Sequence, residues 1–199
     1  MYKVAITGGI GSGKSKVVEL LAQRGVAAYD CDSRAKALMA SSPELREQII
    51  ECFGSEAYDG EEVNRRYLAE RVFNDKEALT KLNAIVHPAV MADFERWAEG
   101  EEGNYVVMES AILFEAGLEG SFDATVSVMA PEELRLERAM LRDGASREQI
   151  EERMRNQMSD DERTDMAKYA IVNIDLEELE EDVEQLHRRL CYDSKPHNN

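Results

Sequence analysis

The stretch that most constrains the fold is GGIGSGKS, residues 8–15, which lies between a β-prone run and a helical one. It fits the pattern G-x-x-x-x-G-K-[ST], and YKVAIT (2–7) with the helix beginning near Lys14 supplies the required strand–loop–helix context. Glycines let the loop turn its backbone N–H groups inward, and the start of the helix adds the positive end of its dipole. The sequence therefore predicts a phosphate-binding loop rather than a glycine-rich turn that only packs strand on helix.

Two side chains at the end of this loop are expected to act on the nucleotide directly. Lys14 should reach the β- and γ-phosphates of ATP, and the Ser15 hydroxyl should ligate Mg²⁺. The residues of this segment that we expect to bind ATP are Gly9, Gly11, Ser12, Gly13, Lys14, Ser15 and Lys16. The loop alone does not specify a reaction, because switch GTPases, motor ATPases and small-molecule kinases share it. The sequence has no Asn-Lys-x-Asp stretch that would select guanine, and its arginine-rich late helices favour a nucleotide-kinase-like enzyme with a lid.

Strand and helix patterns alternate along the 199 residues, which predicts a parallel sheet covered by helices on both faces. The expected strands are 2–7, 26–30, 104–110, 124–130 and 169–174. About 65 residues of almost continuous helical pattern separate the second strand from the third, too many for one crossover helix. We therefore expect a single α/β domain of the P-loop NTPase type over 1–199, with a helical insertion at 33–100, a helical lid at 135–160 and a disordered tail at 193–199.

The second expected strand ends at two acids, Asp30 and Asp32. Ligands of open α/β sheets gather at the carboxyl ends of strands, so one acid here could accept the proton of an attacking hydroxyl. Two residues apart in extended chain, the two side chains face opposite ways and are not expected to act as a pair. Asp32 could instead be the N-cap of a helix that begins at Ser33. Asp30 could contact Mg²⁺ or water, or it could have a structural role.

With the loop and this acid in place, the chain resembles the dephospho-coenzyme A kinase family. The likeness is carried by ITGGIGSGKS (6–15), YDCDSRAKAL (29–38), RRYLAERVFNDKEALTKLNAIVHP (65–88), RAMLRDGASREQIEERMRNQ (138–157) and, more weakly, YAIVN (169–173). The third stretch is the most specific, because other P-loop kinases lack its combination of R-x-L-x-x-x-V-F and L-N-x-x-x-H-P. The resemblance implies ATP-dependent phosphorylation of the ribose 3′-hydroxyl of dephospho-coenzyme A, the last step of coenzyme A biosynthesis.

The resemblance also implies roles for residues outside the loop. The family's general base falls on Asp32, and its arginine-bearing lid brings Arg138 to ATP and Arg142 to the transferring phosphoryl group. Its asparagine near the adenine falls on Asn173. The expected substrate-binding residues are Asp32, Arg66, His87, Leu113 and Glu115, with the insertion at 33–100 holding the substrate.

The sequence departs from the family's pattern at several positions. The family usually has P-L-L-[FV]-E where Ser110 to Glu115 stand here, and commonly Thr where Lys16 stands. Lys168 replaces an aspartate before the last strand, and Ile174 replaces a glycine after it. Details around Asn173 are therefore less firmly implied than the phosphate loop and Asp32, which are intact.

Several candidates retain a structural alternative. A lone His before Pro is more often a satisfied structural residue than a ligand, so His87 has both interpretations. Arg66 could instead pair on a charged helix with Glu62 or Glu70. Glu109, at the end of the third expected strand, could orient Mg²⁺ through water or be a buried structural acid. Most lid arginines are expected to form solvent-facing i,i+4 pairs with glutamates, with one or two left for the phosphoryl group.

The charge and the cysteine content of the chain limit the kinds of partner and compartment that we expect. A net charge of −17 and a pI near 4.6 argue against nucleic-acid or anionic-membrane binding, because phosphate groups would be repelled. Three cysteines without metal-ligand spacing, together with an N-terminus unlike a signal peptide, fit a reduced, cytoplasmic protein. The runner-up function is another small-molecule or nucleotide kinase, and a nucleotide-dependent switch is the alternative from a different class. The sequence gives no oligomeric state.

Overall fold

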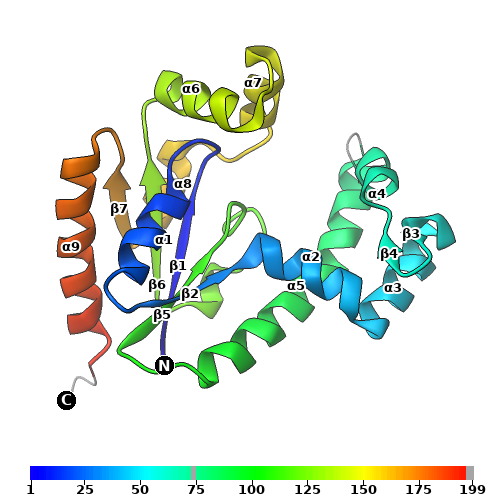
Figure 1. Ribbon diagram of the computed structural model, residues 1–199, viewed down its shortest axis with the longest axis horizontal. Helices are drawn as coiled ribbons and strands as arrows, with labels where there is room; N and C mark the ends of the chain where they lie inside the picture. Colours follow the sequence, from blue (N-terminus) through cyan, green and yellow to red (C-terminus); the bar gives the residue numbers. More distant parts are fainter. Residues whose placement is uncertain (73–74, 196–199) are drawn as a thin grey trace. The chain divides into compact units, whose positions relative to one another are not determined.

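The computed structural model describes residues 1–72 and 75–195 (Figure 1). The chain divides into two compact units, one formed by 1–29 with the segment from 100 onward and the other by 30–99. The second unit corresponds to the insertion expected at 33–100 and begins three residues earlier. None of the described helices combines the length and apolar character needed to cross a bilayer.

The first unit is built on a five-stranded sheet with strand order β2-β5-β1-β6-β7. β1 pairs in parallel with both β5 and β6, and β6 pairs in parallel with β7. β1 is central because its run Val4-Ala5-Ile6 is apolar on both faces and fully buried. The strands are β1 (Tyr2–Gly8), β2 (Ala27–Asp30), β5 (Tyr105–Glu109), β6 (Ala124–Met129) and β7 (Tyr169–Val172).

Helices cover the two faces of this sheet. On one face, side chains of α1 (Lys14–Ala22) and α9 (Leu176–Asp193) join Val4 and Ile6 in the largest apolar cluster, and Figure 1 shows both helices on that side. The opposite face carries Ala5, which packs with Leu113 and Phe114. The remaining elements of this unit are η2 (Glu119–Ser121), α6 (Glu132–Asp143), α7 (Arg147–Arg155) and α8 (Asp160–Met166).

The second unit is mainly helical. Its long helix α5 packs against α2, α3 and α4, and its buried positions along one stripe are Val86, Val90, Phe94 and Ala98. Pro88 lies inside this helix. The elements are α2 (Cys31–Ser41), α3 (Pro43–Phe53), η1 (Ser55–Ala57), β3 (Tyr58–Asp59), β4 (Glu62–Val63), α4 (Arg65–Val72) and α5 (Lys76–Glu99).

Three expectations need correction. The almost wholly helical pattern at 33–98 hides a hairpin, in which β3 pairs antiparallel with β4 around a turn at Gly60. In the second unit, α2 begins at Cys31 and not at Ser33, where the sequence analysis places the start of a helix. The expected tail at 193–199 begins inside α9, whose last residue is Asp193, while Ser194 and Lys195 still bond back to the helix. Residues 196–199 of that tail, and Phe73 and Asn74 of the family-like stretch, lie outside the described residues.

Candidate active site

The loop between β1 and α1 has the backbone form of a phosphate cradle. Gly11 and Gly13 have φ of 76° and 90°, values that side-chain-bearing residues rarely adopt. Gly13 is also the N-cap of α1 and brings no side-chain acceptor to the first-turn N–H groups. A helix start left without a side-chain cap is a ready site for an anion, because its N–H groups and dipole both favour negative charge.

The glycines are also required by close packing around the loop. A Cβ at Gly11 would lie 2.2 Å from the backbone oxygen of Arg135, and a Cβ at Gly13 would lie 1.9 Å from Asn173 Nδ2. The side-chain amide of Asn173 donates to the Ser12 carbonyl at 2.8 Å, and both residues are buried. The Asn173 side chain therefore supports the loop from behind, and its expected place near the adenine stays a prediction.

The reactive side chains of the loop lie at the end of the cradle. Lys14 Nζ donates to the carbonyls of Gly8 and Gly9 at 2.8 and 3.3 Å, so the ammonium folds over the loop itself. Ser15 Oγ donates to Glu109 Oε1 at 2.8 Å, which joins the metal-site candidate of α1 to the acid that ends β5. Lys16 instead pairs with Glu19 on the surface of α1, at 2.9 Å.

A magnesium site fits the Ser15–Glu109 pair, because hydroxyl and carboxylate oxygens are the ligands that this hard cation prefers. Within the described ranges, no group of three or more His, Cys, Asp or Glu side chains could hold a metal ion. Mg²⁺ commonly keeps several waters and binds one or two protein oxygens together with substrate phosphates. The Ser15 hydroxyl and the Glu109 carboxylate are therefore compatible with a Mg²⁺ ion that arrives bound to a nucleotide.

The segment expected to form a lid, residues 135–160, contains a helix break. α6 ends at Asp143 with Gly144 in the left-handed conformation, and Ser146 caps α7 in a reciprocal capping box. Arg142, 61% exposed, bonds to Asp143, and Arg153 bonds to the same carboxylate. The hydrogen bond from Arg142, and after it the one from Arg153, holds the pKa of the Asp143 carboxyl well below its usual range.

Arg138, in α6, lies beside the phosphate loop. Its guanidinium donates to the backbone oxygens of Asn173 and Ile174 at 3.0 and 3.3 Å, and one of its nitrogens lies 4.0 Å from a Cβ built on Gly13. The position of Arg138 is thus beside the cradle, and its expected contact with ATP stays a prediction. Arg138 therefore joins α6 to the turn after β7.

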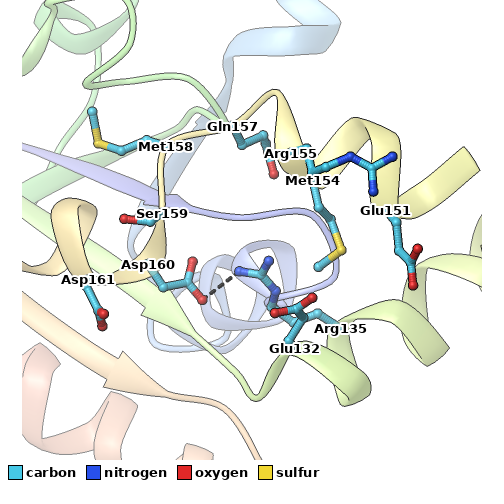
Figure 2. A pocket seen from close by; sticks show the side chains of 10 residues that line it. All are labelled: Glu132, Arg135, Glu151, Met154, Arg155, Gln157, Met158, Ser159, Asp160 and Asp161. Carbon is cyan, nitrogen blue, oxygen red and sulfur yellow. Dashed lines mark hydrogen bonds and ion pairs between the residues drawn. The ribbon is translucent and has the colours of Figure 1, made fainter. Parts of the chain in front are cut away.

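Sequence reasoning missed a set of residues at the base of the lid. Most arginines of the 135–160 segment are expected to face solvent, but Arg135 is only 9% exposed, and it pairs with Asp160 at 2.6 Å. Both side chains line a pocket of about 660 Å³, where Figure 2 shows them facing one another from α6 and α8. Gln157, from the same wall, accepts the backbone N–H of Ile10 at 2.8 Å. Only the apolar positions flanking Arg135 on α6 hinted that this arginine would be buried.

The segment after β5 contains the two expected substrate residues Leu113 and Glu115. Leu113 is fully buried in the cluster with Ala5 and Phe114, so the structure corrects its expected role: it offers no surface to a substrate. Glu115 accepts bonds from the backbone N–H of Met158 and the guanidinium of Arg163, at 3.1 and 3.3 Å. In this structure, Glu115 anchors the end of the lid segment.

The acids after β2 have distinct local roles in the second unit. Asp30 is the N-cap of α2, and its carboxylate accepts the backbone N–H groups of Asp32 and Ser33 at 3.0 and 3.2 Å. The structural role considered for Asp30 is thus the one observed, and the capping role considered for Asp32 is wrong. Asp32 lies in the first turn of α2 with its side chain exposed.

The two remaining candidates are also in the second unit. Arg66 pairs with Glu70 at 2.9 Å, as the structural alternative predicts, and its side chain is 90% exposed. His87 is half-buried in α5, and its burial lowers the pKa of the imidazole below the ordinary value. His87 is therefore mainly neutral at pH 7 and can donate or accept a hydrogen bond.

Comparison with known proteins decides the family. The sequence model of the family described as dephospho-CoA kinase matches residues 2–178. The chain belongs to the dephospho-CoA kinase family. It is 42% identical over 172 residues to a dephospho-CoA kinase of Bacteroides fragilis strain YCH46, covering 86% of this chain and 84% of that one. A Staphylococcus aureus dephospho-CoA kinase is 36% identical over 197 residues, with 97% and 95% covered.

A solved structure supports the same conclusion for the fold. The crystal structure of TT1252 from Thermus thermophilus has a TM-score of 0.85 and 35% identity, and the match covers 95% of this chain and 97% of that one. The α/β fold expected from the sequence, with a five-stranded sheet flanked by helices, is confirmed. The dephospho-CoA kinase family also answers the question that the phosphate loop left open, because it selects an ATP-using kinase over a switch protein.

Proposed function

We propose that this dephospho-CoA kinase transfers the γ-phosphoryl group of ATP to the 3′-hydroxyl of dephospho-coenzyme A with the residues assigned below. The proposal rests mainly on the phosphate cradle, in which Lys14 donates to the Gly8 carbonyl and Ser15 donates to Glu109. Phosphoryl transfer needs little covalent help from a protein, so positioning and charge stabilisation make up most of the catalysis. The cradle supplies both through fixed N–H groups and a cation.

The loop residues from Gly9 to Lys16 hold the triphosphate. When ATP enters, Lys14 exchanges its bonds to the Gly8 and Gly9 carbonyls for phosphate oxygens, which are stronger acceptors for an ammonium group. Ser15 would hold Mg²⁺ directly and Glu109 through a water molecule. Bound Mg²⁺ would neutralise charge on the β- and γ-phosphates.

Asp32 is assigned the general-base role. It follows the last residue of β2 by two positions and is exposed, and its family counterpart is the base. Its carboxylate accepts the 3′-hydroxyl proton as the oxygen attacks phosphorus. Asp30 fixes the start of α2 by capping it, which sets the backbone on which Asp32 stands.

The lid supplies the remaining positive charge. Arg142 is assigned to the transferring phosphoryl group, since its exposed guanidinium has only a surface partner to give up. Arg138 is assigned to ATP from its place beside Gly13 and Asn173. Closure of such a lid excludes water and so suppresses ATP hydrolysis.

The second unit is assigned to the acceptor. Arg66 is an exposed cation suited to substrate phosphates, and His87 offers a neutral imidazole to the substrate. Glu115 contributes through its anchoring of the lid. No disulfide joins the three cysteines, all of which the structure describes, and this supports a cytoplasmic location. The acidic charge supports a protein without nucleic-acid or membrane partners.

The test is an ADP-release assay with dephospho-coenzyme A, uridine and nucleoside monophosphates as acceptors. Turnover only with dephospho-coenzyme A is expected, and preference for another acceptor would overturn the substrate assignment. Asp32→Asn should then lower kcat by about 10²–10⁴-fold with ATP affinity retained. Asp30→Asn is the matched control, because asparagine caps a helix as well as aspartate does. Near-normal turnover of Asp32→Asn would refute the base assignment.

A further inference from the structure

We propose that Arg135 is a positioning residue for the phosphate loop, and that its ion pair with Asp160 fastens both ends of the lid segment to that loop. Arg135 lies one turn into α6, where the lid begins, and Asp160 is the first residue of α8, where it ends. The pair therefore closes the base of the lid, and it does so against the loop that holds the triphosphate.

The contact with the loop is close at two successive glycine positions. A Cβ on Gly9 would lie 2.5, 3.0 and 3.4 Å from Nη1, Cζ and Nη2 of Arg135, so the guanidinium lies directly against this glycine. At Gly11 the nearest atoms are the backbone oxygen, carbon and Cα of Arg135, at 2.2 to 2.8 Å. The loop thus rests on both the side chain and the backbone of a single lid residue.

The residue between these glycines is held by the lid as well. The backbone N–H of Ile10 donates to Gln157 Oε1 at 2.8 Å, and the Ile10 side chain packs against the apolar cluster of α6 and α7 that includes Leu136 and Ile150. Three consecutive loop residues, 9–11, are therefore fixed from outside by the lid's base. A shift of that base has to move the loop, and the loop's N–H groups with it.

Arg135 is held in this place by a buried charge network. Asp160 accepts Arg135 Nη1 at 2.6 Å and Arg163 Nη1 at 2.9 Å. Arg163 is fully buried and continues to Glu115 at 3.3 Å and to the Met158 carbonyl at 2.8 Å. Two arginines face two carboxylates, so the network is neutral and each charge has an opposite partner. Figure 2 shows the Arg135–Asp160 bond on the wall of the pocket.

The primary experiment compares Arg135→Gln with Arg147→Gln. Arg147 is a lid arginine that also has two acidic partners, Glu133 and Glu151, but it is 48% exposed and away from the loop contacts described above. Arg135→Gln leaves Asp160 paired with Arg163, so a folded protein is expected, and circular dichroism with thermal unfolding verifies it. Arg135→Gln should weaken ATP affinity about 10-fold to 100-fold, the range found when residues that orient metal ligands are replaced. The KM for dephospho-coenzyme A should stay within about twofold, and Arg147→Gln should change neither constant.

ATP affinity is measured by calorimetry without acceptor, so the result does not depend on the substrate assignment in the proposed function. Wild-type turnover with dephospho-coenzyme A tests that assignment separately. The positioning role is overturned if Arg135→Gln lowers only the unfolding midpoint. It is also overturned if the variant weakens the binding of ATP and of dephospho-coenzyme A by the same factor.

A second measurement tests the contact itself. Gly9→Ala adds a Cβ whose three nearest neighbours are all atoms of the Arg135 side chain, and the Gly9 backbone is not in the left-handed region. Gly9→Ala should therefore weaken ATP binding at least about fivefold more in the wild-type background than in Arg135→Ala, a coupling typical of contacting residues. Equal losses in the two backgrounds would show that Arg135 swings away freely and does not position the loop.

Discussion

The substitution Asn173→Ala tests how the phosphate loop is supported. Asn173 Nδ2 donates to the Ser12 carbonyl at 2.8 Å, with the two residues 6% and 0% exposed. Removing the amide leaves a buried carbonyl without this donor, which costs about 1–3 kcal/mol. For a chain of this length, that free energy corresponds to a fall in Tm of about 2–12 °C. The backbone oxygen that receives Arg138 is unchanged, so the substitution isolates the amide.

The same free energy should appear in nucleotide binding if the bound triphosphate has to restore the loop. A loss of about 1–3 kcal/mol corresponds to a roughly 5–150-fold weaker ATP affinity. Calorimetric titration with ATP and with GTP measures it, with the exposed Asn104→Ala as control. Because the loop holds phosphates and not the base, the variant should lose affinity for both nucleotides by the same factor. An unchanged Tm with a loss confined to ATP would refute the support role and favour the adenine contact.

Two further predictions concern residues expected to bind substrate. Leu113→Ala should lower the free energy of unfolding by about 2–5 kcal/mol in urea titrations, as for other buried leucines, without a selective rise in the KM for dephospho-coenzyme A. Leu141→Ala, at a position 80% exposed, is its control and should stay within about 0.5 kcal/mol; a selective KM effect at Leu113 would contradict its placement in the core. Because burial lowers the pKa of His87, the unfolded chain binds this proton more readily, and stability should fall as pH drops below about 6.5. His87→Gln should flatten that decline in unfolding free energy measured from pH 7.5 to 5, and an unaltered pH dependence would contradict it.

The phosphate loop could be read from the sequence because its chemistry is local. The spacing of Gly8, Gly13, Lys14 and Ser15 fixes the backbone and the reactive side chains, whatever the distant chain does. The strands were readable for the same reason, since each is a short apolar run ended by turn residues. The helix break at Gly144 likewise has a local cause, one glycine followed by a capping serine.

The predictions that failed concern features that tertiary packing, or the choice between two possible helix caps, determines. Asp30 and Asp32 are equally good caps by residue type, and only the structure shows that the first one caps α2. The hairpin at 58–63 had a signal, the Asp59-Gly60 pair, but a strand of two residues is too short for an alternating pattern. The burial of Arg135 depends on Asp160, 25 residues away, and no local pattern announces such a partner.

The central position of β1 has a consequence for how the protein is made. β1 is synthesised before its neighbours β5 and β6, and the loop that follows it contacts Arg135 and Asn173, which are synthesised later still. A nascent chain that stops before residue 173 would carry the complete glycine motif without the amide that supports it. Nucleotide capture should thus require synthesis as far as residue 173, long after the loop itself has been made.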